Sequence, residues 1–203
     1  MLTGLRRQPV LAVLRPGNEN QARHQLDALL GVGLVHVELA VQASQAWVAM
    51  ATQLVHRYPG LKLGAASVCT GPQLDAAMTA GLGYAVSPIL SQSLLAKAAA
   101  AAFPLVPGVL SPTEVHQAAL WGAQLVKLFP AQPLGPRYWN ALRGPLGTLP
   151  FCIAAGGLDI VDVEPWLAAG VDAVALGSRL FCSGAGEQVM LSAELAPLLA
   201  RLP

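Results

Sequence analysis

The sequence predicts a single-domain (β/α)8 TIM barrel over residues 1–203. Short apolar runs alternate with longer alanine- and leucine-rich segments, and several of the runs begin just after a glycine. Eight such units in this length leave about 25 residues for each, the lower size limit of the fold. The main alternative is a doubly wound open sheet. That fold has a glycine-rich fingerprint after its first strand, whereas the turn over residues 15–18 reads RPGN.

Eight apolar runs are expected to form the barrel strands. Each is short, rich in Val, Ile, Leu or Ala, and followed by turn or cap residues. In chain order the runs cover residues 9–14, 34–39, 61–66, 82–86, 104–107, 123–129, 151–154 and 171–176.

Six segments with polar residues at helical spacing are expected to be the intervening helices. They cover residues 19–30, 43–58, 72–80, 91–102, 112–120 and 161–169. Glycines such as Gly81, Gly122 and Gly170 follow these segments, where a left-handed residue turns the chain into the next strand. The tail, residues 182–203, is expected to be a final helix that packs across the barrel.

Composition excludes several classes of protein. An apolar content of 54% with 11% charged residues excludes a disordered chain. Twelve basic and 11 acidic residues give a net charge of +1, which provides no basic field for nucleic acid. The longest apolar stretch, residues 93–110, contains a lysine, two prolines and a glycine, so no membrane span is expected. No secretory signal is recognisable, which favours the cytoplasm, and cysteine and histidine spacing predicts no metal site.

Lys127 is the most informative residue, since the chain has only three lysines. It lies in the apolar segment QLVKLFPA, where alternation places Leu125, Lys127 and Phe129 on one face, directed into the barrel. Burial disfavours a charged amine and favours the neutral form that condenses with a carbonyl to give a Schiff base. The alternatives are an ion pair with a carboxylate or an amine that extends to solvent.

Glu38 shares a strand face with His36 and lies between a valine and a leucine. A carboxylate in such surroundings needs a partner, and Lys127 across the barrel is a suitable one. Beside an imine, this carboxyl could carry the protons that aldol chemistry requires. A structural ion pair with Arg15 is an equal alternative.

Glycine-rich turns follow the last two expected strands. Gly156 and Gly157 lie in AAGGLD, and Gly177 and Ser178 in ALGSRL. The loops after strands 7 and 8 of such barrels commonly bind phosphate through backbone N–H groups and a helix terminus. Ordinary tight turns are the alternative.

Several motifs together resemble the 2-dehydro-3-deoxy-phosphogluconate aldolase family, which includes 4-hydroxy-2-oxoglutarate and phosphogalactonate aldolases. These are VKLFPA around Lys127, VEL at Glu38, SP at 87–88, AAGGL and ALGSRLF. The resemblance covers nearly the whole chain and implies a class I aldolase without metal or cofactor. It implies cleavage of a 2-keto-3-deoxy-6-phospho sugar acid to pyruvate and glyceraldehyde 3-phosphate, by a homotrimer. The segment LGPRY at 134–138 is slightly more similar to the phosphogalactonate aldolases than to the other members.

The resemblance also assigns roles to residues. Lys127 is similar to the Schiff-base lysine, and Glu38 to the general acid/base that works through a water. The resemblance assigns phosphate binding to Gly157 and Ser178, together with their neighbours Gly156 and Gly177. The residues expected to bind the rest of the substrate are Arg15, Gln42, Ser67, Pro88 and Phe129.

The chain departs from the family pattern at three places. Gln42 stands where the gluconate enzymes carry an arginine, Ala66-Ser67 replaces a glycine-threonine pair, and Ile89 replaces a small residue. Two rival functions therefore stay open: an isomerase or synthase acting on a small phosphorylated substrate, and a non-catalytic ligand-binding relative. The aldolase is favoured because Lys127 and Glu38 are both present.

Overall fold

The computed structural model describes residues 1–183 and 189–202 and has a nine-stranded parallel sheet at its centre. The sheet order is β5-β4-β3-β2-β1-β9-β8-β7-β6. The strands are β1 (Val10–Leu14), β2 (His36–Ala40), β3 (Lys62–Ala66), β4 (Ala85–Val86), β5 (Leu105–Val106), β6 (Gly108–Val109), β7 (Leu125–Leu128), β8 (Phe151–Ala155) and β9 (Ala173–Leu176).

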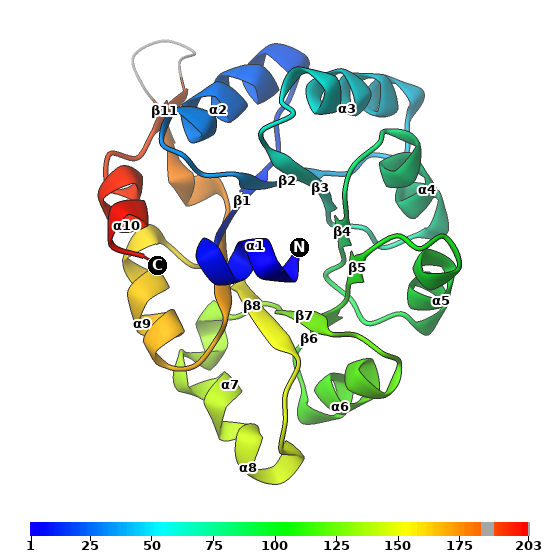
Figure 1. Cartoon of the computed structure of the whole chain (residues 1–203), viewed down its shortest axis with the longest axis vertical. Helices are drawn as coiled ribbons and strands as arrows, with labels where there is room; N and C mark the ends of the chain where they lie inside the picture. Colours follow the sequence, from blue (N-terminus) through cyan, green and yellow to red (C-terminus); the bar gives the residue numbers. More distant parts are fainter. Residues whose placement is uncertain (184–188, 203) are drawn as a thin grey trace.

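The two ends of this sheet, β5 and β6, are separated in the chain by Pro107 alone. β5 pairs with β4 and β6 pairs with β7, so together they act as one barrel strand that is interrupted at the proline. Proline has no N–H to give to a ladder, but its carbonyl accepts a hydrogen bond from Lys127 N at 2.8 Å. The sheet therefore closes into the predicted eight-stranded barrel, whose ring is visible in Figure 1.

Alternation along the strands produces two apolar layers. On β8, Phe151, Ile153 and Ala155 belong to the cluster inside the barrel, whereas Cys152 and Ala154 belong to the larger cluster between sheet and helices. This period of two is the pattern that placed Lys127 on an inward face. The prediction for the direction of the strand faces is confirmed.

All six predicted helices are present on the outside of the ring (Figure 1). Most begin at a Ser, Thr or Asn whose side chain accepts a backbone N–H, as Ser111 does in the capping box of α6. They are α2 (Glu19–Gly31), α3 (Gln45–Arg57), α4 (Gly71–Thr79), α5 (Gln92–Ala100), α6 (Pro112–Leu120) and α9 (Val163–Ala168). None of the described helices is long and apolar enough to cross a membrane.

Short helical turns occupy the remaining connections. Between β7 and β8 lie η1 (Gln132–Leu134), α7 (Arg137–Ala141) and α8 (Arg143–Leu146). The sequence did not predict these three, because glycine and proline shorten each helix. After β8 comes η2 (Ile160–Asp162), and after β9 comes η3 (Ser178–Leu180).

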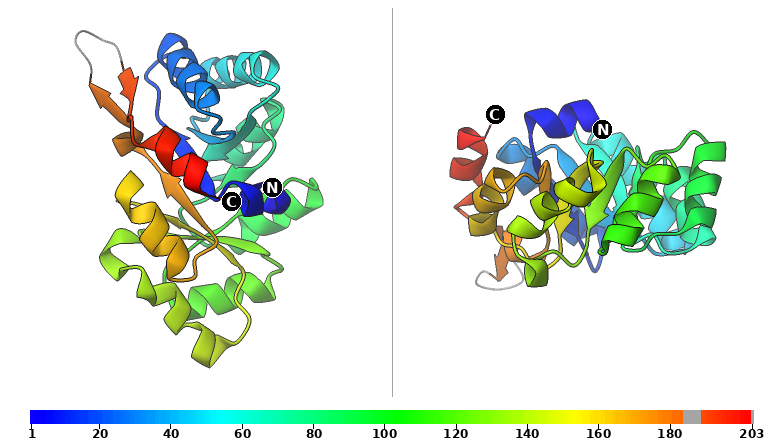
Figure 2. Two further views of the ribbon diagram at one scale, coloured as in Figure 1. Left: turned by 60° about the vertical axis from the view of Figure 1, so that its left-hand side comes forward. Right: turned by 90° about the horizontal axis from the view of Figure 1, so that it is seen from below.

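The two chain ends differ from expectation. An unpredicted helix, α1 (Leu2–Arg7), crosses the barrel axis and inserts Leu5 into the interior cluster (Figures 1 and 2). The prediction of one helix over residues 182–203 is wrong: β10 (Phe181–Ser183) pairs antiparallel with β11 (Val189–Leu191), and only α10 (Leu195–Arg201) is helical. Residues 184–188 of that prediction lie outside the described residues. The described strands pair Phe181 with Leu191, an apolar pair of the kind that favours a hairpin over a helix.

Candidate active site

Lys127 projects from β7 into the barrel and is only 5% exposed. Its neighbours in the sheet are Gly108 on β6 and Ile153 on β8. Burial lowers the pKa of the Lys127 amine, the negative charge of Glu38 opposes this, and the positive charge of Arg15 adds to it. The site therefore enriches the neutral, nucleophilic amine.

Glu38 projects from β2 into the same interior and is 1% exposed. Neither carboxyl oxygen has a hydrogen-bond partner among the described residues. Burial raises the pKa of Glu38 to about 7, although the positive charges of Lys127 and Arg15 oppose the shift. A buried carboxyl without a protein partner and with a pKa near neutrality can both take and give a proton.

The expected alternative, a structural ion pair, is not formed. Three side-chain ion pairs occur among the described residues, and none includes Glu38 or Lys127. Arg15 instead donates from its guanidinium to Ser67 Oγ at 3.2 Å. Lys127 and Glu38 thus interact through their charges without an ion pair between them.

Arg15, Gln42 and Ser67 lie together at the carboxyl ends of β1, β2 and β3. Arg15 and Gln42 line one cavity of about 560 Å³, and Ser67 is held near it by its bond to Arg15. Ser67 has a φ of 63°, a left-handed conformation that few residues other than glycine adopt. The structure therefore gathers three of the predicted substrate-binding residues.

Phe129 and Pro88 border Lys127 from two directions. The Lys127 ammonium nitrogen lies 5.0 Å from the centroid of the Phe129 ring. Pro88 packs its backbone against Gly108, where a Cβ atom would collide with it, and Gly108 is the register neighbour of Lys127. Phe129 is thus close to the amine, and Pro88 lies beside the strand neighbour of Lys127.

The two glycine-rich turns lie side by side, because β8 and β9 pair through Ala155 and Ala175. Gly156 and Gly157 have φ values of 97° and 83°, and a side chain on either would collide with Phe129 or Gln132. Neither glycine donates one of the backbone hydrogen bonds found among the described residues. These N–H groups are available to a ligand.

The N-terminus of η2, the helix end expected to bind an anion beside these glycines, is already capped by a side chain. Asp159 accepts from Ile160 N at 2.7 Å and caps η2, and Arg179 lies 3.6 Å from the same carboxylate. At η2 the Asp159 carboxylate takes the place that an anion would occupy, while phosphate binding by the glycine turns stays a prediction. The free donors belong to the glycine turns.

Tyr84 is a buried neighbour of the Glu38 strand that sequence reasoning missed. It is buried in the interior cluster, and its ring packs on Gly64, the register partner of Glu38 on β3. Burial raises the pKa of the Tyr84 hydroxyl well above its ordinary value, and the charge of Glu38 adds to the shift. A glycine inside a predicted strand is the sequence signal for such a close approach.

Comparisons with known proteins agree with this geometry. The family model of KDPG and KHG aldolase matches residues 2–190. The chain is 30% identical to the 2-dehydro-3-deoxy-6-phosphogalactonate aldolase of Escherichia coli (strain K12), over 93% of this chain and 91% of the relative. It is 31% identical to the 2-dehydro-3-deoxy-phosphogluconate aldolase of Pseudomonas aeruginosa, over 78% and 72%.

A solved structure extends the likeness to three dimensions. The KDPG aldolase of Legionella pneumophila, with pyruvate captured as a covalent carbinolamine intermediate, is 25% identical with a TM-score of 0.79. The match covers 87% of this chain and 85% of that one. Since one family model spans nearly the whole sequence and the barrel and its buried lysine agree with it, the chain belongs to the KDPG and KHG aldolase family.

Proposed function

We propose that this chain is a class I aldolase that cleaves a 2-keto-3-deoxy-6-phospho sugar acid to pyruvate and glyceraldehyde 3-phosphate, with Lys127 as the Schiff-base residue. The observation that carries the proposal is the placement of Lys127 and Glu38 inside one barrel, both nearly inaccessible to solvent and not ion-paired to each other. Structural barrel interiors are filled by apolar side chains, so two ionisable groups there point to chemistry.

The reaction follows from these two groups. The neutral amine of Lys127 attacks the C2 carbonyl of the substrate to give a carbinolamine. Glu38 in its protonated form gives a proton to the leaving hydroxyl, so that water departs and a protonated imine and a Glu38 carboxylate remain. Glu38 removes the C4 hydroxyl proton, the C3–C4 bond breaks, and its electron pair moves towards the imine. An aldehyde leaves and an enamine remains. Glu38 returns the proton to C3 and water hydrolyses the imine, which releases pyruvate and restores Lys127.

The pKa of Glu38 suits both of its steps. A group whose pKa lies near the working pH is an effective base in one step and an effective acid in the next. The value of about 7 places Glu38 there. Burial creates this value, so the apolar interior contributes directly to proton transfer.

Arg15 and Ser67 bind the carboxylate of the 2-keto acid in this proposal, with Gln42 from the same cavity. Their position at the carboxyl ends of β1 to β3 supports the role. Phe129 packs beside the pyruvyl carbons, and Pro88 borders them across Gly108.

The glycine turns bind the terminal phosphate in this proposal. Gly156 and Gly157 offer backbone N–H groups, while Gly177 and Ser178 offer donors from the adjacent loop. Asp159 neutralises Arg179 nearby, so the phosphate relies on backbone donors and on the Ser178 hydroxyl.

We also propose that the enzyme works as a homotrimer in the cytoplasm. Exposed apolar side chains support self-association, among them Leu120 at 70% and Ile89 at 45% exposure. Light scattering of the purified protein coupled to size exclusion measures the mass, and a monomeric mass would contradict the trimer.

Incubation with pyruvate and borohydride, followed by intact mass and peptide mapping, tests the mechanism. We expect a reduced pyruvyl adduct on the peptide that contains Lys127, and none on peptides with Lys62 or Lys97. No adduct on folded protein would contradict the Schiff base and favour the isomerase or binding-protein alternatives. Assays with gluconate- and galactonate-derived substrates then identify the preferred configuration at C4.

A further inference from the structure

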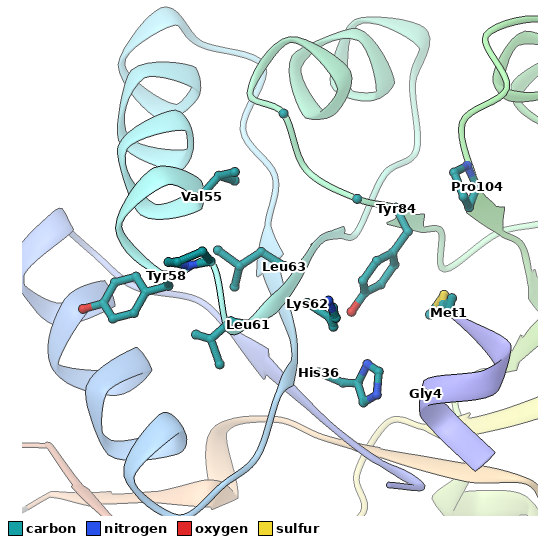
Figure 3. A pocket seen from close by; sticks show the side chains of 13 residues that line it. Met1, Gly4, His36, Val55, Tyr58, Leu61, Lys62, Leu63, Tyr84 and Pro104 are labelled. Atoms are coloured by element: carbon teal, nitrogen blue, oxygen red, sulfur yellow. The ribbon is translucent and has the colours of Figure 1, made fainter. Parts of the chain in front are cut away.

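A second cavity, of about 500 Å³, lies at the amino-terminal end of the barrel. Its lining comes from α1, from the starts of β2 and β3, and from residues just before β4 and β5 (Figure 3). The catalytic groups approach substrate from the carboxyl ends of the strands, so this cavity lies at the opposite end of the barrel. Its size lies within the range that is usual for small-molecule sites.

The walls of this amino-end cavity are apolar on most sides. Val55 from α3, Leu61 and Leu63 flanking the start of β3, and Pro104 before β5 surround it (Figure 3). The Tyr84 ring forms another wall. No Asp or Glu is among the lining residues.

Two nitrogen-bearing side chains give the cavity its polarity. His36 and Lys62 are register partners on β2 and β3, so their side chains start from neighbouring positions. His36 is 3% exposed, its ring lies against Gly4 of α1, and its Nδ1 has no hydrogen-bond partner among the described residues. Lys62 is exposed at the cavity mouth and takes part in none of the ion pairs of the described residues.

We propose that this cavity binds a small organic monocarboxylate with an aromatic or branched apolar body. Its carboxylate would bind Lys62 and His36, and its body would contact Leu63, Val55 and Tyr84. Such a ligand supplies the missing partner of a buried imidazole and the counter-charge of a lysine, while it covers apolar wall.

The charge of the site favours an anionic ligand. Burial lowers the pKa of His36, the Gly4 backbone opposes this, and the positive charges of the N-terminus and of Lys62 lower it further. The positive charge of the site therefore comes from Lys62 and from the N-terminal ammonium of Met1, which also lines the cavity. A neutral ligand would leave Lys62 without a counter-ion.

Tyr84 separates this cavity from the catalytic groups. Its ring lines the cavity, and its hydroxyl donates to Val37 O at 3.4 Å within the strand that carries Glu38. The site is therefore additional to the aldolase centre and does not rest on the proposed aldolase function.

Benzoate and its neutral isostere benzamide are suitable probes. We expect benzoate to shift the imidazole NMR signals of His36, assigned with His36→Gln, in a saturable way, and benzamide to bind at least about fivefold more weakly. Lys62→Gln should weaken benzoate binding by about tenfold without changing the rate of aldol cleavage. Lys97→Gln is the matched control, because Lys97 is an exposed lysine outside the cavity, and should change binding less than twofold.

Four results would overturn the proposal. The first three are no saturable shift of the His36 signals in folded protein, equal binding of the two probes, and unchanged benzoate binding in Lys62→Gln. Protein whose Lys127 carries a reduced pyruvyl adduct should bind benzoate as before, and loss of binding there would place benzoate in the catalytic site. The His36 signals report the amino-end cavity whether or not Lys127 forms a Schiff base, so the two proposals fail independently.

Discussion

The two ends of this barrel use the same strands for different purposes. Towards the carboxyl ends, Glu38 and Lys127 are buried without ion pairs, and glycine turns leave backbone donors free. At the amino end, α1 covers the interior and its Leu5 is fully buried in the apolar cluster. The comparison shows buried ionisable groups towards one end of the barrel and an apolar cover at the other, and it predicts that substitutions at the two ends affect activity and stability respectively.

Replacing Lys127 with Met tests the carboxyl end most severely. We expect kcat to fall by about 10⁴-fold or more, because no other group in the site can form the imine. The fold should persist, since Met fills a similar volume in an apolar interior. A coupled assay for pyruvate and circular dichroism measure the two effects. Lys97→Met is the control, and turnover retained in Lys127→Met would rule out the mechanism.

Glu38→Gln keeps the shape of the site and removes its proton carrier. We expect kcat for cleavage to fall by about 10²- to 10⁴-fold, the usual range for loss of a general acid/base. Borohydride trapping of pyruvate on Lys127 should still occur, since the amine remains. Steady-state kinetics together with trapping separate the two steps. A variant with normal kcat would show that another group carries the proton.

Leu5→Ala tests the amino end, where the comparison predicts a loss of stability instead of activity. A fully buried leucine truncated to alanine lowers the free energy of unfolding by about 2–5 kcal/mol. Denaturant unfolding measures this loss, and kcat of the folded protein should stay within about twofold of the original. Gln117→Ala, on an exposed side chain of α6, should cost little. A strong loss of kcat in Leu5→Ala would show that the amino end also supports catalysis and would contradict the comparison.

The buried carboxyl also makes stability depend on pH. The pKa of Glu38 is about 7 in the folded chain against an ordinary 4.5, so the folded state holds the proton more tightly. This contribution to stability is fully present below about pH 4.5 and is lost as pH rises through about 7. Glu38→Gln should therefore gain stability relative to the original protein across that window, by up to about 3 kcal/mol. Urea unfolding at several pH values measures the difference in unfolding free energy between Glu38→Gln and the original protein. The control is Glu194→Gln, on an exposed side chain, for which this difference should not depend on pH. The same independence in Glu38→Gln would contradict the raised pKa.

Ser178→Ala gives the smallest expected effect and sharpens the picture of the carboxyl end. Loss of one hydrogen bond to a charged phosphate should raise KM for the phosphorylated substrate by about tenfold. KM for unphosphorylated 4-hydroxy-2-oxoglutarate should stay unchanged, as should both values in Ser93→Ala, which lies on α5. Equal increases for both substrates would show that Ser178 does not bind the phosphate.

Local patterns were sufficient to predict most of the fold. Alternation in QLVKLFPA placed Lys127 inside, and polar residues at helical spacing located all six outer helices. The break at Pro107 was not predicted, because only pairing partners reveal that the two halves of the strand bond to different neighbours. Helix α1 was missed because six residues carry too little periodic signal, and its burial depends on the finished barrel.

The candidate site was predictable where one strand determines a residue's surroundings, and not where several strands meet. Glu38 and Lys127 followed from alternation together with the family resemblance. The contact of Tyr84 with Gly64 joins positions from two strands, so no local pattern contains it. The capping of η2 by Asp159 was missed for a different reason. A helix N-terminus can receive either a ligand or a neighbouring carboxylate, and the sequence analysis assigned this one to a ligand.

The pairing that closes the barrel joins two distant parts of the chain. β1 pairs with β9, as between Val10 and Val174, and Glu38 and Lys127 both lie between these strands in the sequence. Contacts between residues far apart along a chain are slow to form. We therefore expect aldolase activity to return during refolding only after β9 has paired with β1.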